Sequence, residues 1–236
     1  MARAAVKWST GTQAEEHKYI RLENIVWGSP VLIQTATIQV TIALYAEDHD
    51  EISFEIYQAG KQEQEMEIFS QGYASLKDSM DLNYVDLQAA RMDCNQQLLL
   101  SVDHLPEIGD IYAGADMILV RLSLPHNMSE SIQSYAVHPN LIHAITQLSA
   151  IWQTHMGNKR SHADISYHPV SIKELDIYHS CTSNMWAKLQ YAPNRGNEDC
   201  IPSLDVEMCD EQGKVCIRIR GLVTVSNEYP AIQIGF

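Results

Sequence analysis

An amphipathic helix beginning at His138-Pro139 is the feature that most constrains the fold of this 236-residue chain. Behind the proline, apolar residues recur at helical spacing: Leu141, Ile145, Leu148 and Trp152. Steps of three and four residues predict one helix over 139–156 with a single buried stripe. Proline is favoured in the first turn of a helix, where its missing N–H leaves no bond unmade. A helix with one buried stripe has to pack against another layer.

That layer is predicted to be a sheet, because runs of alternating apolar and polar residues lie on both sides of the helix. These runs are 38–44, 52–56, 66–76 and 117–124 before it, and 168–178, 184–191, 204–209 and 214–225 after it. A period of two predicts strands with one buried face. Asp210–Gly213 is a hairpin signal between the last two runs.

The order of a helix followed by strands occurs twice, because Met1–Trp8 has the pattern of a short helix ended by Gly11. Strands that do not alternate with helices predict the α+β class, with two fused halves that share a core. We expect the first half at 1–80, a polar linker at 81–116 with a short helix in 86–94, and the second half at 117–236. The four tryptophans lie on the apolar side of the expected elements and are predicted to be core residues.

Composition and charge narrow the function classes. The 45 % hydrophobic content is typical of a globular protein and argues against disorder. A formal net charge of −14 disfavours binding to nucleic acid or to an anionic membrane. Five scattered cysteines indicate a reducing cytoplasm rather than a disulfide framework, and they are expected to be small buried residues. The absence of CxxC and HxxxH pairs predicts no metal site.

Several segments, in the right order, resemble the dehydratase domains of modular polyketide synthases. They are MARAA at the start, the W-x-x-P turn at 27–30, SQGYASL at 70–76, LSLP at 122–125, HPNLIHAITQ at 138–147 and DEQGKVCIRIRGL at 210–222. The resemblance implies a double hotdog, in which antiparallel sheets wrap round central helices. The family's HxxxGxxxxP motif, which carries its catalytic histidine upstream of a MARAA-like run, is not in this sequence. The first half is therefore expected to be incomplete.

The family's second helix carries HPxLLDxxxQ, in which the aspartate is catalytic. Here His143 stands at the aspartate position and Gln147 at the glutamine position, so the resemblance makes them the candidate catalytic residues. His143 is either a proton donor or a histidine left in a decayed site. Gln147 either orients the acid or bonds a nearby backbone group. His138 and Pro139 are candidate substrate-binding residues, with a structural role at the helix start as the alternative.

The family's GxxYGPxFQ segment is also missing from this sequence. Together with the two differences above, this predicts a dehydratase-like domain of polyketide biosynthesis, a branch of secondary metabolism, without dehydratase activity. Such a pseudoenzyme is expected to act as a structural and docking element for acyl carrier protein and the adjacent synthase domains. It would need no cofactor of its own, because the family's substrates are carried on the phosphopantetheine of the carrier. The resemblance also implies a tendency to form homodimers.

The alternative is enzymatic. The chain would be a fragment of an active dehydratase or enoyl isomerase that acts on β-hydroxyacyl or enoyl thioesters of acyl carrier protein, with the catalytic histidine on a missing upstream segment. An isomerase tolerates loss of the aspartate, since one base can both remove and return a proton. The sequence leaves open whether the chain is an enzyme. A free thioesterase-type hotdog is disfavoured, because its nucleophile and base patterns are absent.

Overall fold

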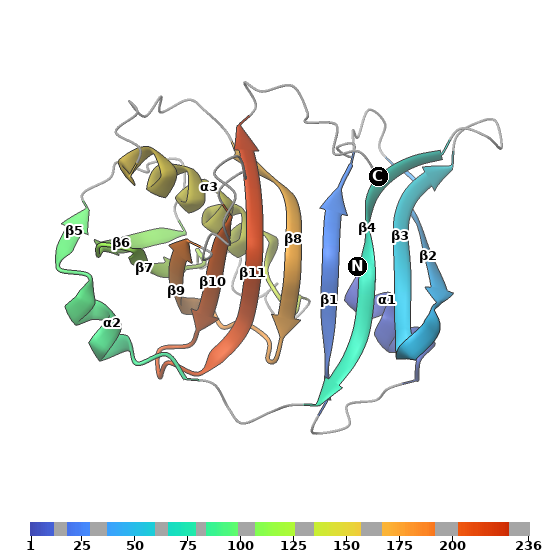
Figure 1. Cartoon of the computed structure of the whole chain (residues 1–236), viewed down its shortest axis with the longest axis horizontal. Helices are drawn as coiled ribbons and strands as arrows, with labels where there is room; N and C mark the ends of the chain where they lie inside the picture. The colour runs from blue at the N-terminus through green and yellow to red at the C-terminus, as the bar shows by residue number, and fades with distance from the viewer. Residues whose placement is uncertain are drawn as a thin grey trace.

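The computed structural model describes residues 1–11, 18–28, 37–59, 66–78, 84–98, 107–125, 135–156, 167–191 and 203–226. Within them, the strands form one 11-stranded sheet in the order β2-β3-β4-β1-β8-β11-β10-β9-β7-β6-β5 (Figure 1). All of its pairings are antiparallel. The α+β class predicted from the order of elements is therefore observed. No helix in the described ranges is long and apolar enough to cross a membrane.

The first half consists of one short helix and four strands: α1 (Ala2–Ser9), β1 (Lys18–Trp27), β2 (Thr41–Ala46), β3 (Glu51–Ala59) and β4 (Met66–Asp78). α1 packs on β1, β2 and β3 and buries Ala2 and Val6. A tight 3-10 turn, η1 (Asp48–Asp50), joins β2 to β3. Ser29 and Pro30, the end of the W-x-x-P turn, lie outside the described residues.

Trp8 corrects the prediction that all four tryptophans are core residues. Its side chain at the end of α1 is 90 % exposed, whereas Trp152 is 1 % exposed. Trp27 and Trp186 are half-buried. In a helix of only eight residues, the side that carries Ala2 and Val6 faces the sheet, and this arrangement turns Trp8 outward.

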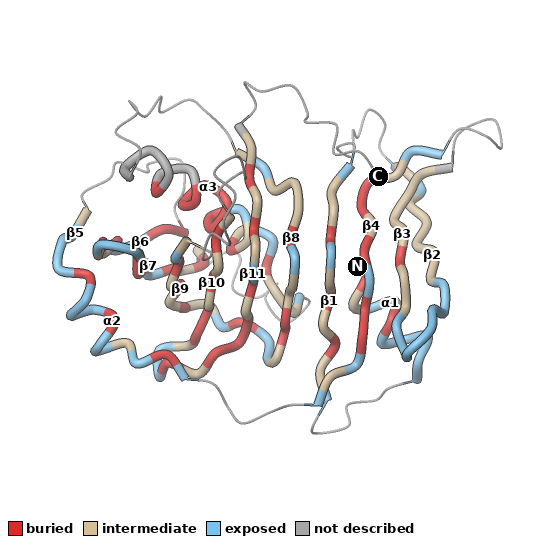
Figure 2. The backbone as a smooth tube through the Cα atoms, viewed as in Figure 1, coloured by how far each residue is buried: buried red, intermediate tan, exposed pale blue. Residues whose placement is uncertain are grey.

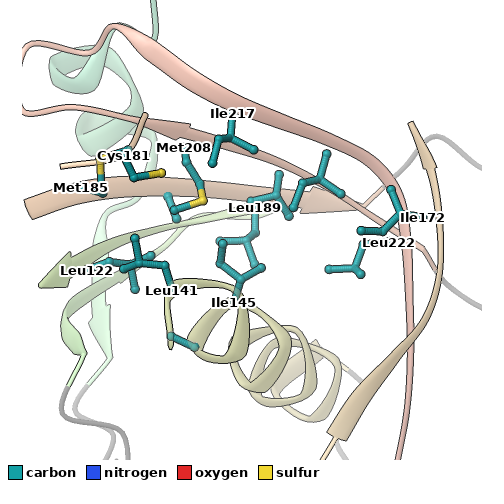
Figure 3. Close-up of a cluster of buried hydrophobic side chains, with 14 of the residues drawn as sticks. Leu122, Leu141, Ile145, Ile172, Cys181, Met185, Leu189, Met208, Ile217 and Leu222 are labelled. Atoms are coloured by element: carbon teal, nitrogen blue, oxygen red, sulfur yellow. The ribbon is translucent and has the colours of Figure 1, made fainter. Parts of the chain in front are cut away.

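The second half wraps a longer helix. It contains β7 (Met117–Ser123), α3 (Pro139–Met156), β8 (Tyr167–Ile177), β9 (Asn184–Tyr191), β10 (Leu204–Cys209) and β11 (Val215–Ser226). α3 has the bounds expected from its periodicity and contacts β7, β8 and β11. In Figure 3, Leu141 and Ile145 reach from the helix toward the strand residues Leu189, Met208 and Ile217. All five side chains are at most 1 % exposed, so the buried stripe of α3 is in the main core.

The range expected to be a linker contributes regular elements to the second half. It holds α2 (Leu87–Asp93), β5 (Gln96–Leu98) and β6 (Ile108–Ala113), and β6 pairs with β7. Asp86 caps α2 by accepting a hydrogen bond from the Ala89 N–H at 2.9 Å. A second small core joins α2 to the sheet through Val85, Ala90, Cys94, Leu119, Cys209 and Val215. The division at 80 and 116 stays a prediction.

The strands β1 and β11, which lie on either side of β8, each change their buried face along their length. Asn24 in β1 has φ 49° and Gly221 in β11 has φ 66°, and Lys173 of β8 lies beside Gly221. In β1 the buried positions change from Ile20 and Leu22 to Ile25, and in β11 they change from Ile217 and Ile219 to Leu222 and Thr224. The left-handed residues shift the alternation by one position and let the strands curl round the core (Figure 2).

Candidate active site

His138 forms the last residue before α3 and is held from several sides. Its imidazole is 6 % exposed, and its Nδ1 accepts a hydrogen bond from the Asn140 N–H at 3.3 Å. Its carbonyl accepts from the Leu141 N–H at 3.0 Å. The Tyr135 ring meets the imidazole edge-on, with centroids 5.3 Å apart. This geometry matches the alternative in which His138 satisfies local backbone, while Pro139 beside it is exposed.

Glu107, which the sequence analysis did not single out, anchors the first turn of α3 to the sheet. Its side chain is 4 % exposed, and its Oε1 accepts a hydrogen bond of 2.6 Å from Asn140 Nδ2. The Glu107 carbonyl accepts from the Ser123 N–H of β7 at 2.8 Å. The carboxylate lies near the positive end of the α3 dipole, which favours a negative charge there. No motif marks this residue, because its partner is 33 positions away in the sequence.

His143 is on the side of α3 that faces away from the buried stripe. Its side chain is exposed, while Leu141 and Ala144 beside it are completely buried. Within the residues that the structure describes, no hydrogen bond, ion pair or ring contact involves His143. A histidine in water has no fixed orientation toward a substrate. The described part of the molecule therefore supplies His143 with neither an orienting group nor a base.

Gln147 lies one turn further along the helix and is bound to the backbone of β8. Its Nε2 donates to the Tyr167 carbonyl at 2.8 Å, and its Oε1 accepts from the Tyr167 N–H at 3.4 Å. The side chain is 8 % exposed. Both ends of the amide are thus occupied at the start of β8, which is the backbone-bonding alternative for this residue.

Gln147→Leu is expected to lower the free energy of unfolding by about 1–3 kcal/mol, because it leaves two backbone groups of Tyr167 without this partner. Urea denaturation measures the loss. Gln190→Leu on β9 is the control, since Gln190 is exposed and its replacement changes stability by about 0.5 kcal/mol or less. Equal stability of Gln147→Leu and the unsubstituted chain would show that the two bonds to Tyr167 contribute nothing.

Metal and thiol chemistry find no support in the described ranges, which contain no group of three metal-binding side chains. Burial raises the pKa of the Cys181 thiol to about 12 and that of Cys209 to about 12. Thiols with such pKa values are protonated at neutral pH and are poor nucleophiles.

A polar hollow of about 190 Å³ is lined by Thr182, Ser183, Asn184, Asp210, Glu211 and Gln212. None of the candidate site residues lines it.

Comparison with known proteins assigns the family. Residues 105–229, more than half of the chain, match the family model described as polyketide synthase dehydratase N-terminal domain. The chain belongs to the polyketide synthase dehydratase family. It is 27 % identical over 236 residues to polyketide synthase PksM of Bacillus subtilis. The aligned region covers 94 % of this chain but only 6 % of PksM. The matched relative is thus a far longer protein.

Solved structures agree with this assignment. A trans-AT polyketide synthase dehydratase domain from Brevibacillus brevis is 29 % identical, with a TM-score of 0.80 over 96 % of this chain and 82 % of that domain. An aspartate-to-asparagine variant of the CurK dehydratase, described as inactive, is 18 % identical with a TM-score of 0.75 over 98 % of this chain and 83 % of its own. A histidine-to-phenylalanine CurK variant, also described as inactive, is 18 % identical with a TM-score of 0.73, over 96 % of this chain and 82 % of its own.

These findings confirm the family and the fold class. The molecule is an α+β double hotdog, with α1 and α3 packed on one sheet that runs through both halves. Of the four predicted site residues, His138, Pro139 and His143 lie within two turns at the start of α3, and Gln147 follows one turn later. Their roles, and the incompleteness of the first half, stay predictions.

Proposed function

We propose that this chain is a dehydratase-like domain of a polyketide synthase that does not remove water from substrates and that docks acyl carrier protein and neighbouring synthase domains. The observation that carries the proposal concerns one position, at which the family has its catalytic aspartate and this chain has an exposed histidine. That position is His143, an exposed residue without a hydrogen bond or ion pair to any other described side chain. Gln147, which would orient the acid, is bound to the backbone of Tyr167 instead.

The chemistry explains why this position decides the activity. Dehydration of a β-hydroxyacyl thioester needs a base for the α-proton and an acid for the departing hydroxyl, both held against one substrate. In the CurK dehydratase, a variant that has lost an aspartate and a variant that has lost a histidine are each described as inactive. This supports the view that a dehydratase of this fold needs both groups. This chain has histidine at the aspartate position.

The docking role is supported by the setting of the relatives. The chain corresponds to 6 % of PksM and 4 % of PksN, each a polyketide synthase. A domain of such a protein stays next to the carrier and catalytic domains of the same synthase, whether or not it catalyses a step. A folded double hotdog without chemistry can therefore still present surfaces to those neighbours.

The second candidate is an active dehydratase or enoyl isomerase that receives its histidine from another part of a longer polypeptide. It is favoured by the coverage of the matched structures, since the chain accounts for 82 % of the Brevibacillus brevis domain. In that protein His143 would be the acid, or, in an isomerase, the aspartate would be dispensable. The two candidates differ in whether a longer polypeptide that carries the upstream HxxxGxxxxP motif is active.

The proposal is tested by incubating the purified chain with a β-hydroxyacyl pantetheine thioester and, separately, with a β,γ-enoyl thioester, and following the products by liquid chromatography and mass spectrometry. We expect neither dehydration nor double-bond migration above the buffer blank, with the Brevibacillus brevis dehydratase domain as positive control. Turnover by this chain would overturn the proposal. Turnover only by a longer polypeptide that carries HxxxGxxxxP would establish the second candidate.

A further inference from the structure

A row of alternating charges crosses the face of the sheet opposite α3. The row, named the charge row below, consists of Arg21, Asp176, Arg218, Glu207 and Lys188. They come from β1, β8, β11, β10 and β9, and each is the direct register partner of the next. Opposite charges that face each other across antiparallel strands stabilise the pairing, and like charges disfavour it. The sign pattern therefore favours this register of the five strands.

One contact of the charge row joins the two halves of the molecule. β1 belongs to the first half and β8 to the second, and they are the adjoining strands in the sheet. Their backbone pairing, named the seam below, runs from Arg21–Asp176 to Val26–Ser171. Arg21 and Asp176 are thus the last pair at one end of the seam, the place from which two strands would begin to separate.

The geometry of this terminal pair is that of a strong ion pair. Arg21 Nε lies 2.7 Å from Asp176 Oδ1, and Nη2 lies 2.9 Å from Oδ2, so the guanidinium binds both carboxylate oxygens. Asp176 is 1 % exposed and the Arg21 side chain is 22 % exposed. Bidentate pairs of this kind fix direction as well as distance, and a buried carboxylate that loses its cation is costly.

Two tyrosines extend the contact beyond the end of the seam. The rings of Tyr19 and Tyr178 meet edge-on, with centroids 4.8 Å apart. The Tyr178 hydroxyl donates to Asp176 Oδ2 at 3.1 Å, and Arg21 Nη2 donates to the Tyr19 hydroxyl at 3.4 Å. Separation of the halves from this end would break the ion pair and the ring contact at once. The two hydrogen bonds each lie within one half, where they hold Asp176 and Arg21 in place for the ion pair.

We propose that Arg21, Asp176, Tyr19 and Tyr178 form a clamp that locks the two halves together, so that the seam does not open separately from the rest of the sheet. The clamp is a conformational device of the fold and does not depend on whether the chain is an enzyme. It keeps the relative position of the halves fixed. Removing Asp176 is therefore expected to loosen β1 and β8 specifically.

A matched control exists within the same charge row. Arg218 also binds a carboxylate with two nitrogens, at 3.1 Å and 2.9 Å from Glu207 Oε1, but both residues belong to the second half. Asp176→Asn and Glu207→Gln each neutralise one carboxylate of nearly unchanged shape. A general loss of electrostatic stability would speed exchange across the whole sheet in both variants, whereas a clamp predicts different places of loosening.

Hydrogen–deuterium exchange of the backbone amides, read by mass spectrometry, tests the clamp. In Asp176→Asn we expect exchange about 100-fold faster in peptides of β1 and β8, because a buried pair has been broken at the end of the seam. Peptides of β9 and β10 should keep their rates. In Glu207→Gln the increase should be confined to β10 and β11, with the seam unchanged.

Uniform acceleration across the sheet in Asp176→Asn, or no acceleration at the seam, would overturn the proposal. If Asp176→Asn does not fold, Arg21→Lys replaces it, because lysine keeps the charge but cannot bind both oxygens in the guanidinium geometry. That variant is expected to show faster exchange in β1 and β8 by about 10-fold, again with β9 and β10 unchanged. Wild-type exchange in a folded Arg21→Lys would count against the clamp.

Discussion

Trp152→Ala is expected to lower the free energy of unfolding by about 3–5 kcal/mol, one of the two largest losses we predict for a single side chain. Trp152 is 1 % exposed and closes the apolar stripe of α3 against the sheet. Its ring lies 6.1 Å from that of Tyr191 on β9, at an angle of 32°. Alanine removes this packing and leaves a cavity that the surrounding strands can fill only in part. Urea denaturation followed by circular dichroism measures the change.

The same substitution at Trp8 is the control. Trp8 is 90 % exposed, so Trp8→Ala is expected to change the free energy of unfolding by about 0.5 kcal/mol or less. Because the two variants delete the same group, their difference reports burial alone. A loss at Trp8 as large as the loss at Trp152 would contradict the placement of the core.

Gly213→Ala is the second large effect, expected at about 2–4 kcal/mol. Gly213 has φ 84° in the hairpin between β10 and β11, a conformation that side chains disfavour. An added Cβ would also lie 2.3 Å from the Val85 carbonyl oxygen. The Val85 N–H donates to the Gly213 carbonyl at 2.8 Å, so the clash would push away the segment that attaches α2 to the sheet. Thermal and urea unfolding both measure this loss of stability in Gly213→Ala.

Gly11→Ala separates the two causes. Gly11 has φ 63°, and an added Cβ there would meet nothing within 4 Å. Its replacement should therefore cost only the backbone strain, about 1 kcal/mol. If Gly213→Ala were no worse than Gly11→Ala, the contact between α2 and the β10–β11 hairpin would have to be looser than the structure places it.

The sequence predicted the elements whose pattern repeats and missed those whose pattern is broken by geometry. The α3 stripe is regular, so its bounds follow from spacing alone. The range 81–116, expected to be a polar linker, contains β6, in which the buried residues Ile108 and Ile111 are three positions apart instead of two. The register shift between them explains the spacing, since a bulge moves the alternation by one residue. A similar shift of the alternation at Gly221 means that a period of two does not predict which residues are buried in the second part of β11.

The candidate site could be located by resemblance, but its contacts could not be predicted. The letters of the HPNLIHAITQ segment are enough to place His143 and Gln147 on one helix. What they touch depends on distant segments: Gln147 meets Tyr167, 20 positions away, and the first turn of α3 meets Glu107 through Asn140. Periodicity describes which face of a helix is buried, and it contains no information on which polar groups meet it.

The measurement that tests the central claim most directly uses acyl carrier protein loaded with a β-hydroxyacyl chain. The loaded carrier is mixed with this chain, and native mass spectrometry records both the complex and the mass of the carrier-bound acyl group over time. The account predicts a complex in which the acyl group keeps its full mass. Loss of one water from the bound acyl group, at a rate above that of the carrier alone, would contradict it.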